Sequence, residues 1–215
     1  MRVAVMQPYL YPYPLYFHLI ASVDLFVLFD CVQFPRRGRI HRAPLPDGGW
    51  LTLPLSRQPR DTRIADLAFA DDAPTLWAER CAALPWLSAE MAETLAAPFA
   101  QGVTTYLEGQ LRRACTMLGI ETPFLRSSTL ALPSNLRGQD RVMAAARAVE
   151  ATTYVNLPGG RELYSPAAFR AKGLGLAFLE PYAGPRVSLL HALSTEPHDA
   201  LRAERAALPP PQEAL

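Results

Sequence analysis

Residues 2–30 read RVAVMQPYLYPYPLYFHLIASVDLFVLFD, and this stretch decides the fold. Residues 2–7 form a short apolar run that stops at a proline, which is typical of a buried parallel strand opening into a loop. Pro14 suits the first turn of a helix over 14–23, where apolar side chains recur at helical spacing. Residues 25–30 form a second apolar strand. Strand, loop, helix and strand make a βαβ unit, which predicts a parallel sheet.

A helical stretch then interrupts the alternation of strands and helices. Residues 50–55 follow an Asp-Gly-Gly turn, and we expect them to form a strand paired with the segment before that turn. Gly119 closes the helical stretch, because glycine is favoured just after the end of a helix. The expected helices cover residues 73–84, 88–100 and 103–118.

The alternation resumes after Gly119. We therefore expect one α/β domain over residues 1–206, with a mostly parallel sheet and a helical excursion over about 73–119. Three adjacent prolines cannot continue a helix, so residues 207–215 are expected to form a flexible tail. The remaining expected elements are strands at 124–128, 153–157 and 176–180 and helices at 138–150 and about 166–171.

Composition excludes several classes of protein. The chain has 215 residues, half of them hydrophobic, and a net charge of +1, so neither a disordered chain nor a generally basic nucleic-acid binder is indicated. No apolar run is long enough to span a bilayer and no signal peptide is evident, so we expect a soluble, cytoplasmic protein. Cys31, Cys81 and Cys115 lack the spacing of a metal site or a disulfide framework. The residues assign no metal or cofactor, and they leave the oligomeric state open.

Polar or backbone-exposing residues follow each strand of the expected parallel sheet. Open α/β sheets bind ligands beyond the carboxyl ends of their strands, and a parallel sheet brings those ends to one rim. Loops are exposed to solvent, and this alone explains the polar character of any one of these residues. The set as a whole favours a binding site. The set comprises Gln7, Tyr9, Asp30, Gln33, Ser127, Ser128, Asn156, Gly159, Gly160 and Glu180.

A second concentration of polar side chains is RRGRIHR at residues 36–42, directly after the second strand. Arginine suits bidentate recognition of phosphate, so Arg36, Arg37, Arg39 and Arg42 predict a phosphate-binding surface for a phosphorylated or nucleotide-linked small molecule. A solvated loop is the alternative interpretation. RNA, including a tRNA end, is a further partner that the same chemistry would serve. The aromatic side chains expected to stack on a base or sugar are Tyr9, Tyr11, Tyr13 and Phe34.

Two residues are the favoured groups for proton transfer. Asp30 is a strand-end carboxylate, and His41 should be neutral because of the arginines around it, which suits a general base. Cys31 is either a thiolate activated by arginines or a small buried side chain, and the second interpretation is favoured. His18 lies inside the first helix and is a weaker candidate base.

The turn after the strand at 153–157 is a further candidate for ligand contacts. Gly159 and Gly160 either let backbone amides approach a phosphate or simply permit a tight turn. Because Asn156 and Tyr164 lie beside them in sequence, we expect contacts to a sugar or nucleotide here.

Several of these motifs together resemble the WbqC-like family, which is named from bacterial surface-polysaccharide (O-antigen) gene clusters. The resemblance implies a bacterial protein of polysaccharide or secondary-metabolite assembly. The family tends to have paired aspartates where this chain has Asp30-Cys31, which argues against a two-carboxylate metal site. The motifs are QPYLYPYPLYFHLIASVDLFVLFDCVQF (7–34), RRGRIHR (36–42), Ser127-Ser128, QDRV around Arg141, and YVNLPGGRELYSPAAF (154–169).

The first loop also resembles the HxGH motif of nucleotidyltransferases and pantothenate synthetase, which implies a Rossmann-like fold of the HUP type. Tyr13 and Tyr16 stand at the two histidine positions, and Leu15 replaces the glycine. A phenol donates only a neutral hydrogen bond at pH 7, so Tyr13 and Tyr16 are expected to line the floor of the site while the arginines supply charge.

Two functions follow as expectations. The first is a transferase acting on an activated, phosphate-bearing sugar, amino-sugar or acyl/aminoacyl donor, held by the arginines of the run and by the two glycines, with Arg141 as a further substrate- or phosphate-binding residue. The second is a non-catalytic nucleotide- or RNA-binding accessory protein.

Overall fold

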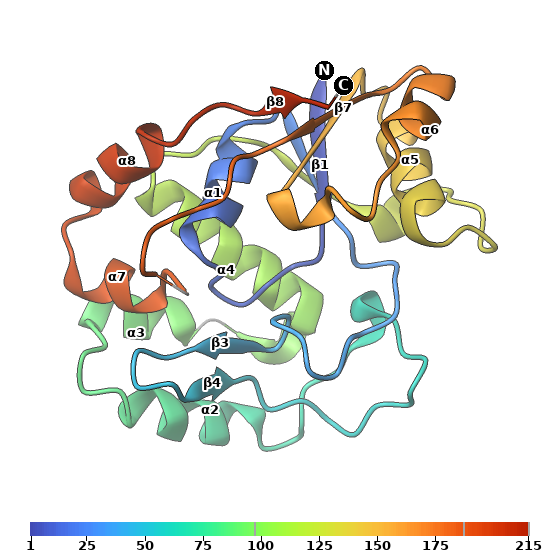
Figure 1. Ribbon diagram of the computed structural model, residues 1–215. Helices are drawn as coiled ribbons and strands as arrows, with labels where there is room; N and C mark the ends of the chain where they lie inside the picture. The colour runs from blue at the N-terminus through green and yellow to red at the C-terminus, as the bar shows by residue number, and fades with distance from the viewer. Residues whose placement is uncertain (97, 187, 215) are drawn as a thin grey trace.

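The computed structural model describes residues 1–96, 98–186 and 188–214. It contains a six-stranded sheet in the order β5-β2-β1-β6-β7-β8, in which the first five strands are parallel and β8 is antiparallel to β7 (Figure 1). The expected α/β class with a mostly parallel sheet is confirmed. The strands are β1 (Arg2–Met6), β2 (Leu25–Leu28), β5 (Phe124–Arg126), β6 (Thr153–Asn156), β7 (Gly175–Phe178) and β8 (Gln212–Glu213).

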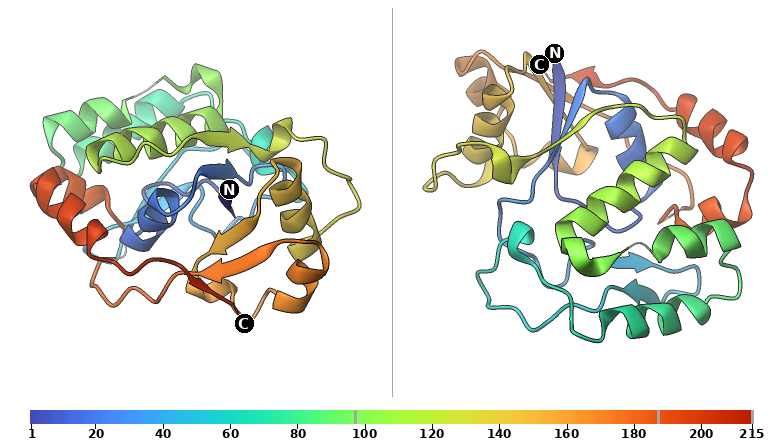
Figure 2. Two further views of the ribbon diagram at one scale, coloured as in Figure 1. Left: turned by 90° about the horizontal axis from the view of Figure 1, so that it is seen from above. Right: turned by 180° about the vertical axis from the view of Figure 1, so that it is seen from behind.

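Helices cover both faces of this sheet. Successive side chains of a strand point to opposite faces, and so Val3 and Val5 of β1 pack in a different apolar cluster from Ala4. The cluster with Val3 and Val5 includes side chains of α5 and α6, and the cluster with Ala4 includes side chains of α1, α4 and α8. Figure 2 (left) shows the ribbons of α5 and α6 on one side of the sheet and those of α1, α4 and α8 on the other. These helices are α1 (Pro14–Ala21), α4 (Val103–Met117), α5 (Gly138–Ala148), α6 (Pro166–Ala171) and α8 (His198–Ala206).

The order of the strands fixes where a ligand crevice would lie. The chain adds β2 and β5 on one side of β1, and then returns to add β6 and β7 on the other side. This is the doubly wound, Rossmann-like order, in which ligands bind beyond the carboxyl ends of the strands. Those ends point down in Figure 1, toward a lobe that holds β3, β4 and α2.

The lobe contains the predicted hairpin and the first part of the helical excursion, whose last helix, α4, packs against the sheet. The segment before the Asp-Gly-Gly turn pairs antiparallel with the segment after it, as expected. Gly119 follows α4 with φ +65°, a backbone conformation that favours glycine. Residue 97, inside the helix expected over 88–100, lies outside the described residues. The elements are β3 (Arg42–Pro44), β4 (Trp50–Thr52), η1 (Ile64–Asp66), α2 (Ala73–Ala82), α3 (Ala89–Leu95) and η2 (Phe99–Gln101).

The end of the chain differs from the expected flexible tail. After α7 (Leu190–Thr195) and α8, residues 212–213 form β8 and bond to the edge of the sheet. Nε2 of His18 also lies 2.8 Å from the carbonyl oxygen of Pro209. Residue 215 lies outside the described part of the chain. No helix among the described residues has the length and apolar character needed to cross a membrane.

Candidate functional site

The parallel strands bring most of the predicted strand-end residues to one rim of the sheet. Ser127, Asp30 and Gln7 follow β5, β2 and β1, and Asn156 is the last residue of β6; these strands are neighbours in the sheet and run in the same direction. Glu180 follows β7, the next strand. The rim therefore gathers side chains from segments that are far apart in sequence.

Asp30 and the two serines form a buried, hydrogen-bonded cluster. Asp30 is 1% exposed. Its Oδ1 accepts hydrogen bonds from Ser127 Oγ at 3.0 Å and from the backbone N–H of Ser128 at 2.8 Å, and its Oδ2 accepts one from Ser128 Oγ at 2.7 Å. Both carboxylate oxygens are therefore used to join the end of β2 to the end of β5. This position gives Asp30 a structural role.

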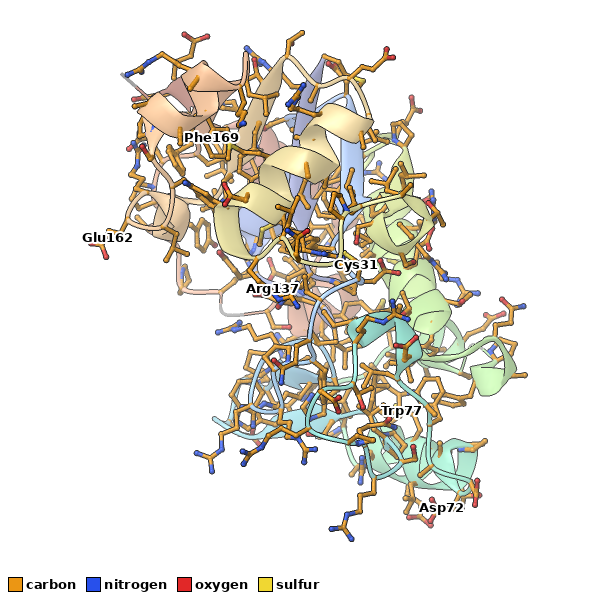
Figure 3. All side chains as sticks on the ribbon, turned by 90° about the vertical axis from the view of Figure 1, so that its right-hand side faces the viewer. Cys31, Asp72, Trp77, Arg137, Glu162 and Phe169 are labelled. Carbon is orange, nitrogen blue, oxygen red and sulfur yellow. The ribbon has the colours of Figure 1, made fainter. Side chains whose placement is uncertain are left out.

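A cleft of about 570 Å³ lies next to this cluster, between the end of β2 and the start of α5, and we call it the rim cleft. Cys31 is 8% exposed, and its Sγ accepts a hydrogen bond from Nε of Arg141 at 3.2 Å. Figure 3 shows Cys31 and Arg137 at the level where the helix-covered sheet meets the lobe that carries Trp77. The lining residues are Cys31, Val32, Gln33, Asp61, Arg63, Ser134, Arg137, Gly138 and Arg141.

The rim cleft has more arginines than carboxylates in its described lining. Arg137 and Arg141 donate hydrogen bonds to main-chain carbonyl oxygens and to Cys31, and neither forms an ion pair within the described residues. Gly138 begins α5, whose first turn makes no hydrogen bond to a capping side chain of the described residues and contains Asp140, so the backbone N–H groups and helix dipole that favour negative charge already have one carboxylate nearby. Asp61 is the one carboxylate in the described lining. The three arginines of the lining therefore outnumber its one described carboxylate.

A second cleft, of about 510 Å³, adjoins the rim cleft at Gln33, which lines both. We call it the arginine cleft because all of its charged lining side chains among the described residues are arginines. Its lining residues are Gln33, Phe34, Pro35, Arg36, Arg37 and Arg60.

The other two arginines of the predicted run pack on aromatic rings. The guanidinium carbon of Arg39 lies 5.9 Å from the centroid of the Tyr13 ring, and that of Arg42 lies 4.3 Å from the centroid of Trp50. Both distances fit a cation–π contact. Two arginines of the predicted run, Arg36 and Arg37, therefore line the arginine cleft, and the other two lie over aromatic rings.

His41 lines a third cleft, of about 370 Å³, which shares Phe34 and Arg36 with the arginine cleft. Burial, and after it the positive charge of Arg42, lowers the pKa of His41, so its imidazole is neutral near pH 7. Its Nδ1 is buried and lacks a hydrogen-bond partner among the residues that the structure describes. His41 therefore keeps the chemistry of a base, at a distance from the rim cleft.

The tyrosines of the loop after β1 pack largely into the protein. Tyr16 is fully buried, and its hydroxyl donates to the carbonyl oxygen of Gln7 at 2.6 Å. Tyr11 is buried with a positive φ of 43°. Tyr9 and Tyr13 are half-buried, and burial raises the pKa of each phenol. The buried tyrosine rings therefore anchor the loop, and the Tyr16 hydroxyl is occupied by its hydrogen bond to Gln7.

Asn156, Gly160 and Tyr164 form a separate group after β6. Asn156 Oδ1 accepts a hydrogen bond from the backbone N–H of Leu157 at 2.8 Å. A Cβ atom at Gly160 would lie 2.2 Å from Asn156 Nδ2 and 3.1 Å from the Tyr164 ring, whereas one at Gly159 would meet no atom of the described residues within 4 Å. Close packing therefore accounts for the second glycine, and the first is exposed.

Sequence reasoning missed Arg60, Arg63 and Arg137. Arg137 carried a usable signal, since it precedes a predicted helix and stands four residues before Arg141, a spacing that puts both on one helix face. An antiparallel bridge between Gln33 and Arg63 places the segment that carries Arg60 and Arg63 beside the clefts. No local pattern in the sequence reports such a bridge.

Comparisons with known proteins place this fold and site in a family. The sequence profile of the WbqC-like protein family matches residues 7–186. The chain is also similar to the uncharacterized protein Rv1507c of Mycobacterium tuberculosis, with 27% identity over 186 aligned positions that cover 78% of this chain and 77% of that protein. No solved structure matches. The chain belongs to the WbqC-like protein family.

Proposed function

We propose that this protein is a transferase that holds the phosphate of an activated donor in the rim cleft. The observation that carries the proposal is the convergence of Arg137, Arg141 and the N-terminus of α5 on one cleft at the rim of a Rossmann-like sheet. The donor classes are a phosphate-bearing sugar, an amino sugar, and an acyl or aminoacyl compound. Polysaccharide or secondary-metabolite biosynthesis in bacteria is the proposed setting.

The rim cleft would act by placing the donor and by neutralising the charge on its leaving phosphate. A guanidinium binds phosphate through two parallel N–H groups, and backbone N–H groups of a helix start bind it without reorganising. Arg141 reaches Cys31 Sγ at 3.2 Å, so a phosphate on Arg141 would lie beside the thiol. Positioning of this kind supplies much of the rate enhancement in group transfer.

Among the donors, the acyl or aminoacyl class is the one that Cys31 favours. The Cys31 thiol would lose its proton to solvent and attack the carbonyl carbon of the donor. The bond from that carbon to the leaving group would break, and the electron pair would depart on the phosphate of an acyl phosphate or aminoacyl nucleotide, or on the sulfur of coenzyme A. An acceptor amine would then attack the thioester carbon, the C–S bond would break with its electron pair on Cys31, and the amine nitrogen would give up one proton to that thiolate.

An accessory protein that binds a nucleotide or RNA without chemistry is the second candidate. The observation in its favour is that Asp30, one of the two favoured groups for proton transfer, and Tyr16, expected on the floor of the site, are buried and hydrogen-bonded within the protein. Substitution of Asp30 therefore cannot separate the two candidates, because it would break a structural cluster.

Thermal-shift screening tests the proposal with nucleotide sugars, acyl-coenzyme A compounds and aminoacyl nucleotides, since a bound ligand raises the melting temperature. The shift given by the best ligand should be lost in Arg141→Gln and kept in Arg147→Gln, which removes the same charge from an exposed position of α5. A shift that survives Arg141→Gln overturns the proposal. If the ligand binds, Cys31→Ser separates the candidates: loss of turnover with binding retained supports the transferase.

A further inference from the structure

The arginine cleft is a concentration of like charges that the fold holds together. Arg36, Arg37 and Arg60 line it, and none of the three forms an ion pair with a carboxylate within the described ranges. The three side chains are exposed, so water weakens their mutual repulsion, and an anion bound between them would offset what remains of it.

Hydrogen bonds to the backbone fix the loops that carry these arginines. Arg42, stacked on Trp50, donates to the carbonyl oxygens of Arg37 and of Gly38, the latter at 3.2 Å. Gln33 Nε2 donates to the carbonyl oxygen of Arg60 at 2.7 Å. The backbone positions that carry Arg37 and Arg60 are therefore set before a ligand arrives, and Arg36 is held by a hydrogen bond to the carbonyl oxygen of Gln58, which lowers the ordering cost of binding an anion.

Gln33 also connects this cleft to the rim cleft, because it lines both. We propose that the arginine cleft is a second anion subsite and that the ligand is a small molecule with two separated anionic groups, one in each cleft. This inference rests on the proposed function, which assigns the donor phosphate to the rim cleft. It adds that the donor itself carries a second phosphate or carboxylate.

Aromatic rings near the clefts argue for a small bis-anion over single-stranded RNA. Single-stranded nucleic acid is bound by stacking bases on open aromatic faces. Phe34 is 8% exposed, and it is the one aromatic residue in the described lining of either cleft. Arg39 and Arg42 lie over the rings of Tyr13 and Trp50, and the 42% exposed Trp50 stands outside both linings. The clefts themselves therefore present charge without an open aromatic face.

Isothermal titration calorimetry tests the second subsite with inorganic phosphate and a series of alkanediol bisphosphates of increasing length. The chain should bind two phosphates, and Arg37→Gln/Arg60→Gln and Arg137→Gln/Arg141→Gln should each remove one. A bisphosphate of the right length should bind one to one and about 100-fold tighter than phosphate, because the second contact becomes intramolecular. Each double variant should abolish that gain, and Arg147→Gln should leave it unchanged.

The outcomes separate the two proposals. A single phosphate site that depends on Arg137 and Arg141 would overturn the second subsite and leave the proposed function standing. A site that depends on Arg37 and Arg60 alone would overturn the proposed function and this inference with it. Affinity that does not change with bisphosphate length, or a 12-nucleotide single strand that binds tighter than every bisphosphate, would also overturn the second subsite. Circular dichroism of each variant excludes misfolding as the cause of a lost site.

Discussion

Arg141 donates a hydrogen bond from Nε to the Sγ of Cys31 at 3.2 Å, although the two residues are 110 positions apart in the chain. The contact joins the first turn of α5 to the end of β2 and places a thiol beside a guanidinium in one cleft. A free thiol and a guanidinium group therefore lie together in the rim cleft.

A ligand in the rim cleft should protect Cys31 from alkylation. Saturating pyrophosphate is expected to slow carboxamidomethylation of Cys31 by about tenfold or more, since a ligand at 10 times its Kd leaves about a tenth of the sites open. Cys81, which lines a different cleft on α2, is the internal control, and burial raises the pKa of its thiol to about 11. Peptide mapping by mass spectrometry reports both rates. Equal Cys31 rates with and without pyrophosphate would contradict the assignment.

Asp30→Ala should destabilise the protein strongly. It removes a buried carboxylate that accepts three hydrogen bonds, so the free energy of unfolding should fall by about 3 kcal/mol. Asp71→Ala, at an exposed position, should change it by less than about 0.5 kcal/mol. Urea denaturation measures both. A stable Asp30→Ala protein would show that the cluster with Ser127 and Ser128 does not hold the strands together.

The two adjacent glycines after β6 should respond differently to alanine. Gly160→Ala should lower the free energy of unfolding by about 1–3 kcal/mol, because its Cβ would meet the Asn156 amide at 2.2 Å. Gly159→Ala meets no atom of the described residues within 4 Å and is expected to be close to neutral. Thermal unfolding compares the melting temperatures of the two variants. Equal values would show that Asn156 and Tyr164 move aside without a loss of stability.

Stability should decrease between pH 7 and pH 5. Burial lowers the pKa of both His18 and His41 from the ordinary value of 6.5, so below that pH the unfolded chain binds more protons than the folded one. Their contribution is fully present above pH 6.5 and is lost as the pH falls toward the lowered values. Urea unfolding at half-unit steps measures the slope. His18→Gln should flatten it, and an unchanged slope would contradict the sign for His18.

Much of the fold could be predicted from the sequence. The βαβ unit followed from apolar runs around Pro14, and α6 has the bounds expected from its spacing, Pro166–Ala171. The apolar stripe of the first helix predicted that one face would be buried. Helix α1 is buried on nearly all sides, because it contacts α8 as well as the sheet. Strand β8 could not be predicted, since backbone pairing with β7 holds a segment that has no strand pattern of its own.

The candidate site was less predictable than the sheet. Asp30 was placed at the rim from its position after a strand, but its bonds to the serines depend on β5 lying beside β2, which no local pattern specifies. The arginine run was visible as a cluster, yet packing on Tyr13 and Trp50 withdraws half of it from the clefts. Side chains from loops complete both clefts, and the path of a loop depends on tertiary contacts.

The central claim is that an anionic ligand binds at Arg141 and the start of α5. Nuclear magnetic resonance tests it most directly, by following the Arg141 Nε–Hε and Gly138 amide signals during a titration with pyrophosphate. We predict that both signals shift together along one saturable curve, while the Arg147 Nε–Hε signal stays in place. Saturable binding that leaves the Arg141 and Gly138 signals unmoved would contradict the account.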